Sequence, residues 1–238
     1  MTDTQAGFAR RFGELYQTQW IYGNGTVDLV GEIAKIAAAG EVLASQLGME
    51  EVMAHAFRLF RPMLHTEAKD TMLLLERYES LSVWAEAETA AQTSPLWMSA
   101  ILANQDNNQT WLGDAYHMLD DSLDPPPELT SDFISVDWTV YDPTKKVALV
   151  EFPQLVQELA HHVKTAGFDG TVVRYFAMTT AAGSALNYAH LWLEHSSPSM
   201  LGEVLAWRRS ALEMQDWRNR LDAICGEIKA HHLLTQVA

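Results

Sequence analysis

The 238-residue chain contains a single cysteine, Cys225. One thiol cannot form a disulfide within the chain, and it cannot supply the cysteine set of a structural zinc site. Basic residues are also scarce, with 16 against 31 acidic residues, which gives a formal net charge of −15. A surface of this charge repels phosphate backbones, so we expect no nucleic-acid partner.

Long apolar runs and several common enzyme motifs are missing as well. No stretch of 18 uninterrupted apolar residues occurs, so we expect neither a membrane span nor a membrane partner. The first residues, MTDTQAGFARRFGELYQ, lack the basic start and apolar segment of a secretion signal, which favours a cytoplasmic location. The absence of P-loop, GxGxxG, GxSxG and HExxH patterns argues against a nucleotide enzyme, a serine hydrolase or a zincin.

The composition is instead that of a packed globular protein, with 48% hydrophobic and 10% aromatic residues. An acidic segment with three consecutive prolines, DDSLDPPPE at residues 120–128, divides the chain almost in half. Such a run cannot join a helix or a central strand. We therefore predict an N-terminal domain over 1–122, an extended linker over 123–132 and a C-terminal domain over 133–238.

The second half alternates between strand and helix patterns in the order βαββαβ. The expected elements are a strand at Ile134–Tyr141, a helix at Gln154–Thr165 with Pro153 in its first turn, strands at Thr171–Met178 and Ala189–Glu194, a helical stretch from Ser197 to about Ile224 that is broken near Glu213 and ended by Gly226, and a strand at Ile228–Val237. Residues 147–152 fit either a short strand or the entry to the first helix.

The first half has the same order of patterns. The expected elements are a strand at Leu15–Tyr22, a helix at Val27–Leu47, a strand within Val52–Leu64, a strand at Thr71–Tyr78, a helix from Ser80 to about Leu102, and a strand near Ala115–Leu119. Four pairs of segments match in sequential order: Trp20–Tyr22 with Trp138–Tyr141, Arg58–Phe60 with Arg174–Phe176, Leu75-Glu76 with Leu193-Glu194, and Trp97 with Trp217. We interpret the chain as a duplication, an α+β fold of two tandem ferredoxin-like (βαββαβ) units.

Residues 73–101 carry a recognisable packing signature. A strand ends in Glu-x-Tyr-Glu-Ser-Leu, a helix is entered with Trp84 three residues on, and Pro95-x-Trp97 follows one helix later. This stretch resembles the antibiotic biosynthesis monooxygenases of the dimeric α/β-barrel superfamily, and residues 190–221 resemble them more loosely. The resemblance implies two sheets packed face to face in a barrel, which is usually built across a homodimer and which tandem copies can build within one chain.

The resemblance also implies a range of activities, because the superfamily includes cofactor-free or flavin-dependent aromatic oxygenases, polyketide cyclases, isomerases and haem-binding enzymes. We expect a tailoring oxygenase that acts on a polycyclic aromatic, polyketide-derived molecule by deprotonating it for reaction with oxygen. The alternatives are a cyclase or isomerase of the same fold, or a ligand-binding or scaffold protein without turnover.

Candidate site residues lie on the predicted strands of the second half. His190, Trp192 and Glu194 alternate along one strand and therefore share a face. We predict that His190 is a catalytic base, that Arg174 stabilises a developing oxyanion, and that the substrate is bound by Trp192, Tyr175 and His232. The competing interpretations are a structural histidine and a salt bridge between Arg174 and Glu194 across adjacent strands.

Cofactor expectations follow from ligand spacing. Although the chain has nine histidines, no pair shows the i, i+4 spacing with a carboxylate that would indicate a metal site. We therefore expect no metal and no cofactor, with reduced flavin as the alternative and haem less favoured. A small aromatic substrate is the expected partner.

Overall fold

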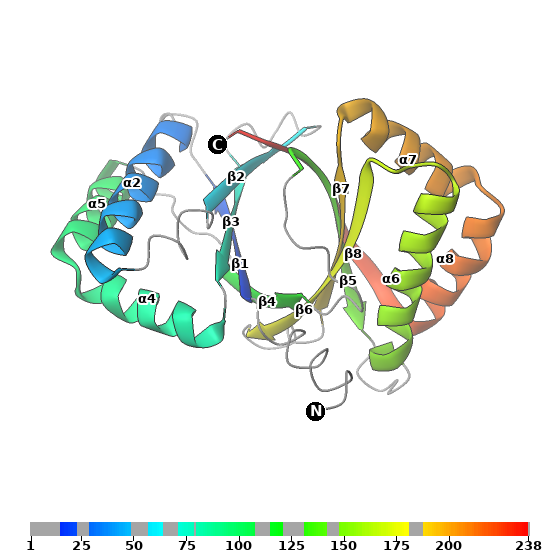
Figure 1. The fold of residues 1–238 in the computed structure, drawn as a ribbon, viewed down its shortest axis with the longest axis horizontal. Coiled ribbons are helices and arrows are strands. Elements are labelled where there is room, and N and C mark those ends of the chain that lie inside the picture. Colours follow the sequence, from blue (N-terminus) through cyan, green and yellow to red (C-terminus); the bar gives the residue numbers. More distant parts are fainter. Residues whose placement is uncertain are drawn as a thin grey trace. The chain divides into compact units, whose positions relative to one another are not determined.

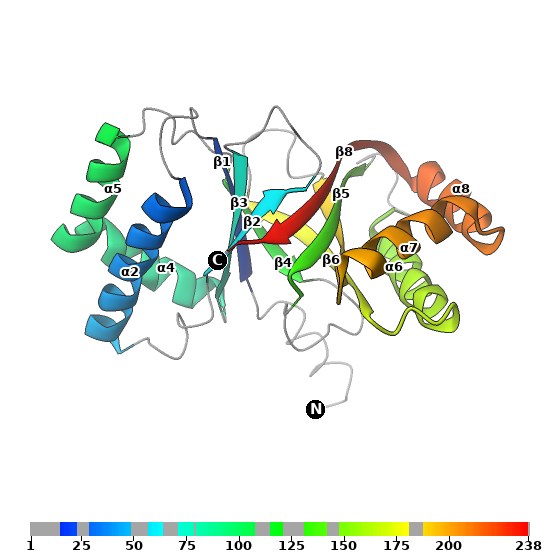
Figure 2. The ribbon, with the colours of Figure 1, turned by 90° about the horizontal axis from the view of Figure 1, so that it is seen from above.

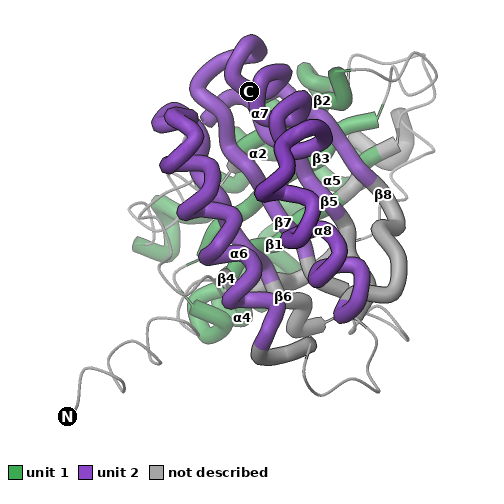
Figure 3. Tube along the Cα trace, turned by 90° about the vertical axis from the view of Figure 1, so that its right-hand side faces the viewer, with its two compact units in different colours: residues 1–118, 236–238 green, residues 119–235 purple. Residues whose placement is uncertain are grey.

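The structure is a computed structural model that describes residues 15–22, 29–48, 57–63, 71–78, 80–107, 115–120, 131–141, 148–180 and 188–237. The fold is a mixed α+β fold that divides into two compact units (Figure 3). Unit 1 comprises Met1–Met118 and Gln236–Ala238, and unit 2 comprises Leu119–Thr235. Residues 121–130 lie outside the described residues, so the linker stays a prediction. None of the described helices is both long and apolar enough to cross a membrane.

Unit 2 consists of one antiparallel sheet with helices on one of its faces (Figures 1 and 2). Its elements are β5 (Phe133–Tyr141), α6 (Ala148–Thr165), β6 (Thr171–Thr180), β7 (Tyr188–His195), α7 (Pro198–Ser210), α8 (Glu213–Ile224) and β8 (Cys225–Gln236). The strand order is β8-β5-β7-β6. The predicted break near Glu213 is confirmed, and β8 follows α8 directly, so Gly226 lies within the strand and does not end the helix.

A core of buried hydrophobic side chains holds the helices of unit 2 against the sheet. Buried side chains of β6 and β7, including Val173, Leu191 and Leu193, pack with Leu155 and Leu159 of α6 and with side chains of α8. Residues 148–152 are the start of α6, which settles the ambiguity between strand and helix. Pro153 consequently lies inside the helix and not in its first turn. A proline there removes one backbone hydrogen bond, and we attribute its tolerance to the burial of the apolar residues around it.

Unit 1 has the same kind of architecture, with helices on one face of an antiparallel sheet (Figure 1). Its elements are β1 (Leu15–Tyr22), α2 (Leu29–Leu47), β2 (Phe57–Pro62), β3 (Thr71–Tyr78), α4 (Leu81–Thr93), α5 (Pro95–Asn107) and β4 (Ala115–Asp120). The strand order is β4-β1-β3-β2. Ile33 of α2 packs against Ile21, Leu59 and Leu74 of the strands. The bounds predicted for β1 and β3 are confirmed.

The single helix predicted from Ser80 to Leu102 is wrong, because the segment forms two helices. Ser80 caps α4 by accepting a hydrogen bond from the backbone N–H of Val83 at 3.2 Å. Pro95 then disfavours a helical conformation at Ser94, and α4 ends there. The hydroxyl of Ser94 accepts from the backbone N–H of Trp97, which caps the start of α5.

Helix caps and strand registers allow the two units to be compared position by position. Ser80 precedes α4 and Ser197 precedes α7, and each of these helices has 13 residues. Arg58 pairs with Leu75 as Arg174 pairs with Trp192, so the two arginines are equivalent. Trp20 and Trp138 are equivalent as well, because they pair with Leu73 and His190, which both lie seven positions before their caps. Two of the matches read from the sequence are therefore supported by register.

The other two matches are out of register. Counting from the caps, Glu76 is equivalent to Leu193, and Arg77 is equivalent to Glu194, so the predicted match was shifted by one residue. Trp97 lies three residues after the end of its preceding helix at Ser94, whereas Trp217 lies six residues after Ala211. A shift of one residue in a strand moves a side chain to the opposite face. Glu76 and Glu194 accordingly face opposite ways.

The turn between α6 and β6 depends on Gly170. A Cβ atom built on Gly170 would lie 2.3 Å from Oγ of Ser196 and 3.3 Å from Cε of Met200. We expect Gly170→Ala to lower the free energy of unfolding by about 1–3 kcal/mol in urea titrations, because the added methyl group overpacks this contact. Gly202→Ala is the matched control, since nothing lies within 4 Å of its Cβ position inside α7. It should stabilise by up to about 1 kcal/mol, and equal effects of both variants would refute the steric account.

Candidate functional site

The sheet of unit 2 has two faces of different character. One face packs against the helices through Val173, Tyr175, Leu191 and Leu193. Side chains alternate along strands, so the neighbouring positions lie on the opposite, helix-free face. The described residues of this helix-free face include Ile134, Val136, Arg174, Phe176, His190, Trp192, Glu194 and His232. Four of the five predicted site residues, Arg174, His190, Trp192 and His232, are therefore brought to one surface.

His190 and Trp192 are in direct contact on β7. The indole Nε1–H of Trp192 donates to Nδ1 of His190 at 3.3 Å, and the two rings are stacked at 6.4 Å between centroids. Phe176 meets Trp192 edge-on at 5.2 Å. Burial lowers the pKa of His190 to about 3, with a further contribution from the charge of His232. His190 is therefore a neutral imidazole at physiological pH.

Arg174 and Glu194 form a buried ion pair beside this contact. Nε of Arg174 donates to Oε1 of Glu194, and the two side chains are 0% and 1% exposed. The salt bridge considered from the sequence is thus present. A charged pair buried in this way needs both partners, because removing one leaves an uncompensated charge in a low-dielectric region. Arg174 is also the register neighbour of Trp192, which places its guanidinium group on the same face as His190.

His232 and Tyr175, the other two predicted site residues, lie on opposite faces of the unit 2 sheet. Val136 pairs with Trp192 on one side and with His232 on the other, so His232 belongs to the helix-free face. Tyr175 lies on the helix side, where it packs in the core with its ring 4.7 Å from that of Phe152. The geometry gives Tyr175 no access to the surface that carries His190, and its substrate-binding role stays a prediction without structural support.

In the part of unit 1 that the structure describes, the equivalent face carries other residues at the positions of His190 and Trp192. Leu73 and Leu75 occupy the positions of His190 and Trp192, and Arg77 occupies the position of Glu194. Arg58 lies over the ring of Phe60 at 5.0 Å and donates from Nε to Oε1 of Gln236 at 2.7 Å. Among the described residues, the contact between a histidine and a tryptophan on this face is thus found in unit 2 and not at the equivalent positions of unit 1.

A second polar cluster, which the sequence reasoning missed, lies on the helix side of the unit 2 sheet. Asp137 is 5% exposed, pairs with Nη2 of Arg208 at 2.9 Å, and contacts Nδ1 of His231. Burial alone would raise the pKa of Asp137, but the charge of Arg208 and the contact with His231 lower it to about 2. The signal available in the sequence was a carboxylate in the middle of the strand ISVDWTVY.

His195 occupies a neighbouring position on the helix side. Its Nε2 lies 3.2 Å from Oγ of Ser135, and its Nδ1 lies 3.1 Å from Oγ1 of Thr171. Burial, and then the charge of Arg208, lower its pKa to about 4. His195 is thus a neutral, hydrogen-bonded residue at the end of β7.

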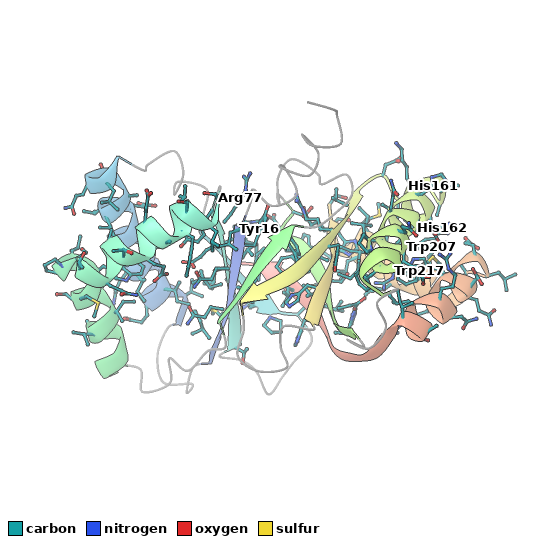
Figure 4. All side chains as sticks on the ribbon, turned by 90° about the horizontal axis from the view of Figure 1, so that it is seen from below. Tyr16, Arg77, His161, His162, Trp207 and Trp217 are labelled. Atoms are coloured by element: carbon teal, nitrogen blue, oxygen red, sulfur yellow. The ribbon has the colours of Figure 1, made fainter. Side chains whose placement is uncertain are left out.

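The tryptophans and histidines labelled on the helices of unit 2 in Figure 4 are spread over three elements. Trp217 of α8 is 2% exposed and donates from Nε1 to the carbonyl of Leu155 at 2.7 Å, which identifies it as a core anchor. Trp207 of α7 donates to Glu213 at 3.2 Å. His161 and His162 of α6 line a surface hollow with Gln157 and Glu158. Within the described residues, no group of three or more His, Cys, Asp or Glu side chains has the geometry to hold a metal ion.

Comparison with known proteins gives information on the fold. No family model and no curated protein match this sequence. Solved structures do match over nearly the whole chain at identities of 9–13%. Likeness at this identity shows the fold alone.

Three of these structures illustrate the range of the fold. A protein from Fusobacterium nucleatum subsp. nucleatum ATCC 25586, named as a monooxygenase, is 13% identical, with a TM-score of 0.56 and coverage of 95% of this chain and 93% of that one. An anthrone oxidase-like protein is 11% identical, with a TM-score of 0.64 and coverage of 95% and 92%. A mutant chlorite dismutase from Candidatus Nitrospira defluvii in complex with cyanide is 10% identical, with a TM-score of 0.54 and coverage of 100% and 96%.

The chlorite dismutase-like structures correct the expectation about cofactors. We expected no cofactor, but chlorite dismutase-like proteins of this fold are haem proteins, so that expectation is wrong. Haem iron takes a neutral imidazole whose other ring nitrogen is held by a hydrogen-bond partner, often a carboxylate. Among the described histidines, His231 has this donor set, because Asp137 holds its Nδ1. His195 does not fit, since hydroxyl groups contact both of its ring nitrogens.

Proposed function

We propose that the chain is an oxygenase of the monooxygenase-like class that acts on a polycyclic aromatic, polyketide-derived small molecule. The observation that carries the proposal is the gathering of Arg174, His190, Trp192 and His232 on the helix-free face of the unit 2 sheet. The monooxygenase and anthrone oxidase-like names borne by proteins of the same fold support it. Two tandem ferredoxin-like units, related by the shared caps and registers, form the scaffold that we propose for this site.

In this proposal the helix-free face of unit 2 binds the substrate and orients it. Trp192 and Phe176 offer aromatic surfaces for a planar ring system. His190 and Arg174 contact the substrate oxygen, on which negative charge develops as the substrate releases its proton to the solvent. His232 lines the same face. The stabilised carbanion or phenolate is then held for reaction with O2, which is the oxidant that takes up the electrons lost by the substrate.

Haem and flavin enter the proposal as groups to be tested. A haem group would be held by His231, whose ring is oriented by Asp137 and, behind it, by Arg208. It would supply redox chemistry with oxygen species. The activity assay is therefore performed on the protein as purified, after loading with haemin, and with reduced flavin added.

The deciding experiment is oxygen uptake with anthrone and hydroquinone substrates. We expect turnover by the wild type, and a fall of at least about a hundredfold for His190→Ala. His161→Ala serves as the matched control, because it removes an exposed histidine from α6 and should leave the rate unchanged. Substrate consumption without oxygen uptake would indicate the cyclase or isomerase alternative. Binding without any consumption would indicate a ligand-binding protein, and either result would refute the oxygenase.

A further inference from the structure

We infer that His190 acts as a neutral hydrogen-bond donor to a delocalised oxygen anion of phenolate or enolate type, and that Trp192 is the positioning residue that fixes it in this role. The inference rests on the proposed function, because it names the ligand class of the same site. It also replaces the role of catalytic base that the sequence suggested for His190.

The tautomer of His190 follows from its hydrogen bond with Trp192. An indole nitrogen can only donate, so the 3.3 Å contact requires a lone pair on Nδ1 of His190. In a neutral imidazole the other nitrogen then carries the hydrogen. Nε2 is therefore an N–H donor, and it cannot accept a proton from a substrate while this contact persists.

The charge state points in the same direction. His190 is 1% exposed, and burial together with the nearby charge of His232 disfavours the imidazolium form. A second proton on Nδ1 would also place an N–H against the indole N–H of Trp192. A neutral donor of this kind polarises an oxygen atom without exchanging protons with it.

The charge balance of the face selects the kind of anion. The positive charge of Arg174 is already offset by Glu194 in the buried pair, and His190 is neutral. Apart from a proton on His232, the described residues of this face thus provide hydrogen-bond donors without net positive charge, so a compact anion would not recover its cost of desolvation. A phenolate or enolate spreads its charge over a planar system that can lie against Trp192 and Phe176. Phosphate and acetate are therefore poor ligands for this site.

Ring-nitrogen NMR of ¹⁵N-histidine-labelled, full-length protein tests the tautomer directly. We expect the wild type to show a neutral His190 with its hydrogen on Nε2 between about pH 5 and pH 8. Trp192→Phe removes the indole N–H donor and keeps an aromatic ring, so the Nδ1–H form should appear. Trp207→Phe is the matched control, because its indole contacts Glu213 instead, and it should leave the His190 signals unchanged. A wild-type His190 that carries its hydrogen on Nδ1, or that titrates near neutrality, would overturn the inference.

Titration with p-nitrophenol tests the ligand class, because its absorbance distinguishes phenol from phenolate. We expect the bound molecule to ionise at a lower pH than the free one, with phenolate affinity falling about tenfold or more in Trp192→Phe. Inorganic phosphate should not displace it. Preferred binding of the neutral phenol, displacement by phosphate, or no binding at all would each overturn the inference. A bound phenolate without oxygen uptake from any aromatic substrate would instead refute the proposed oxygenase and leave the ligand class intact.

Discussion

Arg174→Met should lower the free energy of unfolding by about 3–5 kcal/mol, because it leaves the carboxylate of Glu194 buried without its partner. Both side chains are almost fully enclosed, so water cannot take over the lost interaction. Urea unfolding followed by tryptophan fluorescence measures the change. Methionine keeps most of the volume of the arginine stem, which separates loss of charge from loss of packing.

Two further variants make this result decisive. The double variant Arg174→Met/Glu194→Leu should recover most of the loss, because no buried charge remains. Arg220→Met breaks the exposed pair of Arg220 with Glu158 and should cost less than about 1 kcal/mol. If the single variant at Arg174 costs no more than the one at Arg220, or if the double variant is less stable than Arg174→Met, the buried-pair account is wrong.

The sequence was sufficient for most elements because their signals are local. The short apolar run within Thr71–Tyr78 indicates a strand, and Ser197 before Pro198 indicates the start of a helix; both predictions are confirmed. The break at Ser94-Pro95 was missed because the apolar spacing continues across it, although proline was a sufficient reason to expect it. Alternation also predicted that His190, Trp192 and Glu194 share a face.

The parts that could not be predicted depend on register and on distant partners. Nothing local indicates that Glu76 is equivalent to Leu193, because a one-residue offset becomes visible only through the caps. The cluster of Asp137, Arg208 and His231 joins residues from β5, α7 and β8, which are separated by up to 94 positions. The role of His190 stays a prediction, because its tautomer depends on the contact with the indole of Trp192, whose orientation no local sequence pattern gives.

Glu76 of β3 should make unit 1 less stable as the pH rises. Its side chain lies on the helix side of β3, beside Glu88 of α4, and the residue is only 7% exposed. Burial, with a smaller contribution from Glu88, raises the pKa of Glu76 from 4.5 to about 8. Burial also raises the pKa of Tyr78, which is therefore uncharged at neutral pH. Neither Glu88 nor Tyr78 thus offers a positive charge that would stabilise the ionised carboxylate of Glu76.

The sign of the effect follows from proton binding. Between pH 4.5 and about 8 the unfolded chain has released the proton of Glu76 while the folded chain still holds it. The contribution of Glu76 to stability is therefore highest below pH 4.5, declines through this window, and levels off above pH 8 as the carboxyl group also ionises in the folded state. A pKa shift of this size lowers the free energy of unfolding by about 5 kcal/mol over the whole window.

Glu76→Gln should remove this decline, because the amide has nearly the same shape and does not ionise. We expect the variant to be more stable than the wild type by several kcal/mol at pH 8 and similar to it near pH 4.5, with urea unfolding performed across the range. Glu86→Gln, an exposed position on α4, is the matched control and should keep the wild-type pH dependence. An unchanged decline in Glu76→Gln would show that the carboxyl group of Glu76 is ionised in the folded protein at neutral pH, and the buried-acid interpretation would then fail.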